Sequence, residues 1–109
     1  MADKNPKIGI LMGSDSDLEV MRETEKRLDS FGIAYETRIL SAHRTPEKAA
    51  EYAATAQQRG LEAIICGAGA AAHLAGAIAA NTTLPVIGIP IDSSSLNGLD
   101  ALLAPVQMP

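Results

Sequence analysis

The chain has 109 residues, 47% hydrophobic and 20% charged, which is typical of one globular domain and excludes an intrinsically disordered chain. Nine Lys and Arg against thirteen Asp and Glu give a net charge of -4, which argues against general binding to nucleic acids or anionic membranes. The polar N-terminus lacks a secretory pattern, no apolar run is long enough to span a bilayer, and Cys66 is alone, so we expect a cytoplasmic protein.

Strands and helices are predicted to alternate in the first half of the chain. Almost wholly apolar runs predict strands covered on both faces, and apolar residues recurring at helical spacing predict helices. Gly32 can end the first helix, and Thr45 suits the N-cap of the second helix, which Pro46 opens. The predicted elements are a strand over 7–12, a helix over 17–31, a strand over 34–40 and a helix from 46 to about 59.

The second half continues the same alternation. Its predicted elements are a strand over 63–66, a helix over 70–80, a strand over 85–89 and a short helix over 97–103. The helix over 70–80 carries no charge, and a helix that is apolar all round is buried on every side. In so small a domain, this predicts that another subunit covers it and that the protein is a homo-oligomer.

This order of elements predicts a single α/β domain over residues 1–109. Right-handed crossovers between successive strands give a parallel sheet with helices on both faces. The predicted fold class is therefore a flavodoxin-like three-layer αβα arrangement with strand order 2-1-3-4. In such sheets a ligand binds beyond the carboxyl ends of the strands, where the winding reverses, here between the first and third strands.

The turn after the first predicted strand offers groups for an anion or a sugar. Ser14 and Ser16 supply hydroxyls beside the free amides of a helix N-terminus, which favour a phosphate. Asp17 would repel a phosphate, so it is better suited to the hydroxyls of a ribose or another polyol. The alternative is that these three residues only cap the helix.

The turn after the second predicted strand is the most informative motif, Ser41-Ala42-His43-Arg44-Thr45-Pro46. A cation just before a helix N-terminus is unfavourable unless an anion joins it, so Arg44 indicates a phosphate. His43 can transfer a proton near neutral pH, as acid–base chemistry at carbon or nitrogen requires. The alternatives are a solvated surface arginine and a histidine that only packs or caps.

The turn after the third predicted strand is less specific. Gly67 and Gly69 can let the backbone approach a ligand, but they do not complete a dinucleotide-binding fingerprint. His73 lies in the first turns of an apolar helix, where a lone histidine is usually a core or interface group. The two histidines and Cys66 lack metal-ligand spacing, so we expect no metal, and Cys66 is expected to be a buried, inert thiol.

Taken together, these motifs resemble the N5-carboxyaminoimidazole ribonucleotide mutase family of purine biosynthesis. The resemblance runs from about Lys7 to the last residue and is carried by segments 13–17, 41–46, 67–69, 71–74 and 106–109. It implies an isomerase of IMP biosynthesis that moves a carboxylate from the exocyclic nitrogen of an aminoimidazole ribonucleotide to the neighbouring ring carbon. The family is thought to release and recapture carbon dioxide without a cofactor or metal, and the resemblance also implies a homo-octamer.

The resemblance further implies roles for individual residues. His43 would shuttle the proton between nitrogen and carbon, Ser14 and Arg44 would bind the ribose phosphate, and Asp17 would bind the ribose hydroxyls. The substrate-binding residues implied in this way are Ser14, Ser16, Asp17, Ser41, Arg44, Gly69, Ala70 and His73.

Some features leave other interpretations open. Family members usually have glycine and proline where this chain has Ala70 and Ala75, and they continue past residue 109 with a strand and a long helix, so we expect a C-terminally shortened chain. A sister branch, which carboxylates the aminoimidazole directly, usually has lysine in place of Arg44. The alternatives are therefore that direct carboxylase, a non-catalytic nucleotide-binding module, or a flavin-binding protein, which the scarcity of aromatic residues disfavours.

Overall fold

The computed structural model describes residues 5–69, 73–92, 99 and 102–104. Its elements, in chain order, are β1 (Ile8–Met12), the short 3-10 helix η1 (Asp15–Asp17), α1 (Leu18–Ser30), β2 (Tyr35–Ile39), α2 (Pro46–Ala56), β3 (Ala63–Gly69), α3 (Leu74–Ala79) and β4 (Val86–Ile91). The strands form one parallel sheet in the order β2-β1-β3-β4. The α/β class and the 2-1-3-4 order predicted from the sequence are confirmed.

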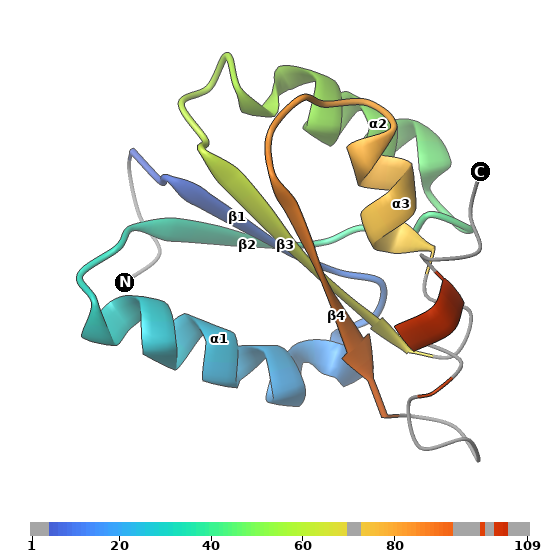
Figure 1. Cartoon of the computed structure of the whole chain (residues 1–109), viewed down its shortest axis with the longest axis horizontal. Coiled ribbons are helices and arrows are strands. Elements are labelled where there is room, and N and C mark those ends of the chain that lie inside the picture. The colour runs from blue at the N-terminus through green and yellow to red at the C-terminus, as the bar shows by residue number, and fades with distance from the viewer. Residues whose placement is uncertain (1–4, 70–72, 93–98, 100–101, 105–109) are drawn as a thin grey trace.

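The sheet lies between two helical layers, with α1 on one face and α2 and α3 on the other (Figure 1). Successive side chains of a strand point to opposite faces, and β1 shows this directly. Ile10 and Met12 pack with Met21 of α1. Leu11, between them in sequence, packs on the opposite face with residues of α2 and α3. This explains why the first strand is apolar at almost every position.

Two glycines with positive φ follow the two long helices, and Gly32 ends the first of them as the sequence predicts. Gly32 follows α1 with φ +70°, and the amide of Ile33 donates to the carbonyl oxygen of Leu28 at 3.0 Å. Gly60 follows the last turn after α2 with φ +97°, a backbone conformation that costs glycine little because it has no Cβ. The second helix is shorter than predicted, since residues 57–60 form a turn rather than a further helical segment.

The third strand is longer than predicted. It continues through Gly67 to Gly69, which pairs with Ile91 of β4. A Cβ at position 67 would collide with the side chain of Met21 and crowd Ile91. Gly67 therefore makes room for α1 to pack on the sheet.

Only part of the uncharged helix is covered within one chain. Leu74 and Ile78 of α3 are buried against the sheet, whereas Ala79 is exposed. The predicted start of this helix at 70 lies outside the described residues. Of the predicted helix over 97–103, residues 99, 102 and 103 are described and are helical. Within the part of the chain that the structure describes, no helix is long and apolar enough to cross a membrane.

Candidate functional site

The turns that follow β1, β2 and β3 meet at one edge of the sheet. In the parallel register Met12, at the end of β1, lies opposite Ile39, at the end of β2, and Gly67 of β3, so β1 and β2 end level and β3 continues to Gly69. Two contacts join the turns across this edge. The Arg44 side chain donates from Nη2 to the carbonyl oxygen of Gly13 at 2.9 Å. The rings of His43 and His73 lie edge to face, with centroids 5.3 Å apart.

The first turn is organised by Ser14. Its Oγ accepts a hydrogen bond from the amide of Ser16 at 3.2 Å and lies 3.0 Å from the Ser16 hydroxyl oxygen. The capping role that the sequence left open for Ser14 is therefore present in the structure, at the start of η1. The Ser14 and Ser16 hydroxyls nevertheless lie together on the edge of the sheet that Arg44 faces.

Asp17 is the buried carboxyl group of this turn, with 9% of its surface exposed. Burial raises the pKa of the Asp17 carboxyl, and a backbone hydrogen bond from Ser14 opposes that rise. Asp17 makes no capping hydrogen bond to α1. A carboxyl group held in this way, rather than used as a helix cap, is suited to accept hydrogen bonds from the hydroxyls of a sugar.

The second turn is folded around the side chain of Ser41. Ser41 Oγ accepts hydrogen bonds from the amide of His43 at 3.2 Å and from the amide of Arg44 at 3.0 Å. Both lone pairs of this oxygen are thus engaged, so the group that Ser41 can offer to a ligand is its hydroxyl hydrogen. The side chains of His43 and Arg44 are exposed at the surface of the turn.

Thr45 stands at the N-cap of α2, as predicted, but its side chain does not cap the helix. Its Oγ1 instead turns back to Ser41, accepting from the Ser41 amide at 3.0 Å and donating to the Ser41 carbonyl oxygen at 3.1 Å. Sequence reasoning missed this arrangement because Thr before Pro46 carries the same signal whether it caps the helix or not.

The third turn contributes His73, which is half-buried at the start of α3 and faces His43. Gly69 ends β3 and is half-buried. Ala70 lies outside the described residues. The carbonyl group of Gly13 is a site component that the sequence does not reveal, since no local pattern indicates which backbone oxygen a distant arginine will reach.

Cys66 stays apart from this edge. It is buried in the core, where burial raises the pKa of its thiol to about 12, so it is protonated and unreactive at neutral pH. Among the described residues, no cluster of His, Cys, Asp and Glu side chains is arranged to hold a metal ion.

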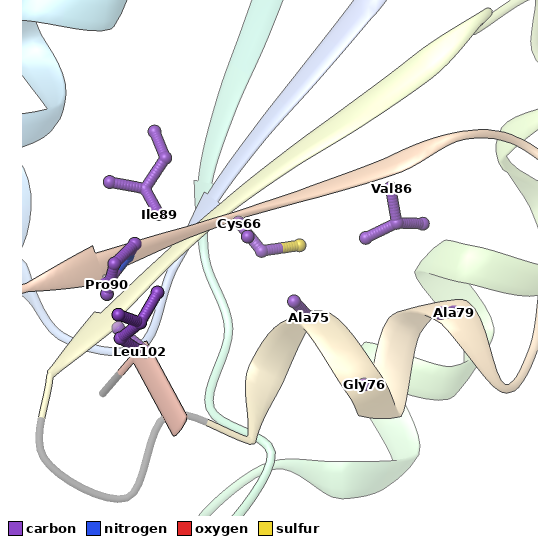
Figure 2. Close-up of a pocket in the computed structure, with 10 residues that line it drawn as sticks. Cys66, Ala75, Gly76, Ala79, Val86, Ile89, Pro90 and Leu102 are labelled. Carbon is purple, nitrogen blue, oxygen red and sulfur yellow. The ribbon is translucent and has the colours of Figure 1, made fainter. Parts of the chain in front are cut away.

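A separate apolar groove of about 330 Å³ lies beside β4 and α3 (Figure 2). In Figure 2 the Cys66 sulfur, Ala75 and Val86 point into the space between the strand and the helix, with Leu102 at its end. The groove contains none of the residues that the sequence analysis assigned to substrate. The polar edge formed by the three turns is therefore the better candidate for the functional site.

Comparison with known proteins agrees with the sequence motifs. The family model for AIR carboxylase matches residues 7–109. The N5-carboxyaminoimidazole ribonucleotide mutases of Pyrococcus horikoshii and Thermotoga maritima are 62% and 59% identical to this chain, over 100% and 95% of its length. The Bacillus subtilis mutase is 56% identical over 95% of the chain. The chain spans 60–62% of the length of the first three curated relatives.

Solved structures show the same fold. Crystal structures of Treponema denticola PurE and of a variant of PurE2 from the same organism superpose with TM-scores of 0.81, at 32% and 30% sequence identity. They cover 95% and 96% of this chain, which corresponds to 66% of each of those chains. With the family model matched over almost its whole length, this chain belongs to the AIR carboxylase family.

Proposed function

We propose that this protein is an N5-carboxyaminoimidazole ribonucleotide mutase, an isomerase that forms 4-carboxyaminoimidazole ribonucleotide for IMP biosynthesis. The observation that carries the proposal is the meeting of the His43-Arg44 turn with the Ser14 turn, through the 2.9 Å bond from Arg44 to Gly13. The names of relatives at 54–62% identity support the choice of reaction. No cofactor or metal is part of the proposal.

The reaction divides into a bond cleavage and a bond formation. The bond between the exocyclic nitrogen and the carboxylate carbon breaks, carbon dioxide leaves, and the nitrogen takes up a proton. The neighbouring ring carbon then attacks carbon dioxide and loses its own proton. His43 suits this exchange because an imidazole can both give and accept a proton near neutral pH. His43 lies beside His73, whose ring closes one side of the site.

Substrate binding falls to the groups around His43. Arg44 and the hydroxyls of Ser14 and Ser16 would hold the ribose phosphate, and the buried Asp17 would accept hydrogen bonds from the ribose. The Ser41 hydroxyl hydrogen would point to an anionic oxygen of the substrate, since the Ser41 oxygen already accepts two amides. Gly69 at the end of β3, Ala70 and His73 would complete the substrate-binding residues.

The assembly is proposed to be a homo-oligomer, an octamer by the family resemblance, in the cytoplasm. The uncharged helix α3 supports this, because its outer side is only partly covered within one chain. An apolar helix face that water reaches is a natural surface for another subunit.

The proposal is tested by following the ultraviolet absorbance of N5-carboxyaminoimidazole ribonucleotide without ATP or bicarbonate. We expect conversion to the 4-carboxy isomer. A parallel reaction supplies aminoimidazole ribonucleotide with bicarbonate, and turnover in that reaction alone would identify a direct carboxylase instead.

His43→Asn separates catalysis from binding in the same assay. We expect turnover to fall by about 10²- to 10⁴-fold, the usual contribution of a general acid–base group, with ligand affinity by calorimetry little changed. Unchanged turnover in His43→Asn would refute the role of His43. Binding without turnover in the wild-type chain would make the protein a nucleotide-binding module.

A further inference from the structure

We infer that Thr45 is a positioning residue of the site, which acts through Ser41 to fix the backbone that carries His43 and Arg44. This inference rests on the proposed function for its kinetic part. The reason to look at Thr45 is that its hydroxyl does not do what its place in the chain predicts. An N-cap threonine normally accepts a hydrogen bond from an amide of the helix, which stabilises the helix. Thr45 makes no such bond.

The hydroxyl is used instead in a two-way clasp with Ser41. Thr45 Oγ1 accepts from the Ser41 amide at 3.0 Å and donates to the Ser41 carbonyl oxygen at 3.1 Å, and the Thr45 amide donates to the same carbonyl oxygen at 2.9 Å. The Thr45 hydroxyl makes two of these hydrogen bonds and the Thr45 amide makes the third. Together they hold the amide and the carbonyl group of Ser41 in place. Thr45 is half-buried, so water competes less for these bonds than at an exposed turn.

The clasp affects the site because Ser41 is itself hydrogen-bonded to the residues that follow it. With its backbone fixed, Ser41 directs its Oγ to the amides of His43 and Arg44 at 3.2 and 3.0 Å. These two amides belong to the residues proposed for proton transfer and phosphate binding. A chain of hydrogen bonds thus runs from Thr45 through Ser41 to the backbone of both functional residues.

Thr45 gives up the locally favoured capping bond and makes another interaction instead. Positions of this kind are expected at functional or strained sites. Because the clasp sets the backbone before both His43 and Arg44, its loss should lower kcat and raise KM together. A misplacement of about 1 Å in a catalytic group can cost roughly 10²-fold in rate.

The experiment compares Thr45→Val, which keeps the shape of the side chain and removes the hydroxyl, with Thr45→Ser, which keeps the hydroxyl. Thr55→Val is the matched control, since the Thr55 hydroxyl makes an ordinary hydrogen bond to the Glu51 carbonyl oxygen at 2.9 Å within α2. We expect kcat/KM to fall by about 10- to 100-fold in Thr45→Val and to stay near the wild-type value in Thr45→Ser. Thr55→Val also loses a hydroxyl hydrogen bond, so it should lower Tm without lowering kcat/KM. Equal losses in Thr45→Ser, or a loss that only follows Tm, would overturn the inference.

A double-mutant cycle tests the route through Ser41. If Thr45 acts through this residue, Thr45→Val should add little to the effect of Ser41→Ala, because Ser41→Ala already removes the hydroxyl that Thr45 positions. Fully additive effects on kcat/KM would show that Thr45 acts by another route.

Hydrogen exchange of the His43 and Arg44 amides gives a readout that does not need activity. We expect these amides to exchange faster in Thr45→Val and at the wild-type rate in Thr45→Ser and Thr55→Val. Unchanged exchange in Thr45→Val would contradict the inference even if the enzyme is active. An inactive wild-type chain with the expected exchange pattern would instead remove the proposed mutase function and leave the clasp standing.

Discussion

Arg44 shows at the scale of one residue how a distant turn is brought to the site. Its guanidinium reaches the Gly13 carbonyl oxygen, 31 residues away in sequence, although the side chain is exposed. A single hydrogen bond leaves other donors of the guanidinium for a phosphate, and their fork geometry favours two parallel bonds. Lysine has the charge but not this geometry.

We therefore expect Arg44→Met to weaken substrate binding more than it slows chemistry. KM should rise by about 10- to 100-fold, as expected for loss of a charge-assisted contact of roughly 1.5–3 kcal/mol, while kcat changes less. Arg44→Lys should fall between the wild type and Arg44→Met. Steady-state kinetics measure both values, with Arg27→Met, an exposed arginine in the last turn of α1, as control. A loss confined to kcat would contradict the phosphate-binding role.

At the scale of elements, the buried carboxylate of Glu36 ties β2 to α2 and to the turn that follows α2. Glu36 is 8% exposed and accepts hydrogen bonds from the Tyr52 hydroxyl at 2.6 Å and from Arg59 Nη1 at 3.1 Å. Burial acts to raise the pKa of the Glu36 carboxyl, but the bonds from Tyr52 and Arg59 outweigh it, so the pKa lies below its ordinary value. Gly9 allows this contact, because a Cβ there would collide with the Tyr52 hydroxyl.

The lowered pKa fixes the direction of the pH dependence. A carboxyl group whose pKa is lower in the folded state contributes stability above its unfolded pKa of about 4.3, and that stability is lost as the pH falls through the folded value. Removing the Tyr52 hydroxyl should therefore reduce the free energy of unfolding near pH 7 and move acid unfolding to higher pH.

Tyr52→Phe should lower the free energy of unfolding by roughly 1–3 kcal/mol, the cost of leaving a buried charged acceptor without one donor. Urea unfolding at pH 7 and at pH 4, at one protein concentration, measures the effect. Tyr35→Phe is the matched control, because the Tyr35 hydroxyl donates to an exposed carboxylate, Asp29, at 3.2 Å. Equal losses in both variants would contradict the importance of burial at Glu36.

The elements also show what the sequence could predict. Local patterns gave the strand order, the end of α1 at Gly32, and the edge of the sheet where the turns after β1 and β2 meet. They could not predict the packing role of Gly67. The space that a side chain would occupy at this position is taken by Met21, from a helix far away in sequence. Nor could they show that the Thr45 side chain bonds to Ser41 and not to its helix, because the sequence is the same whichever partner the hydroxyl takes.

At the scale of the whole molecule, helix α3 is the element through which we propose that subunits assemble. The outer side of α3 is apolar, and Ala79 is exposed there within one chain. If another subunit covers this helix, a charge at Ala79 would have to be buried without a partner on assembly, which is costly. The same charge would be harmless in a monomer.

Ala79→Glu should therefore shift the protein to smaller species, which light scattering coupled to size-exclusion chromatography measures directly. Ala54→Glu, at an exposed alanine of α2, is the control and should keep the wild-type mass. A wild-type chain that is monomeric at micromolar concentration, or an Ala79→Glu variant of unchanged mass, would contradict burial of α3 between subunits.

Amide chemical shifts recorded by NMR during titration with 4-carboxyaminoimidazole ribonucleotide bear on whether one ligand engages several separate loops at once. We predict that signals from Ser14, Ser16, Arg44 and His73 move together and follow a single dissociation constant. Shifts confined to one of these loops, or located instead along the groove beside β4, would contradict the account.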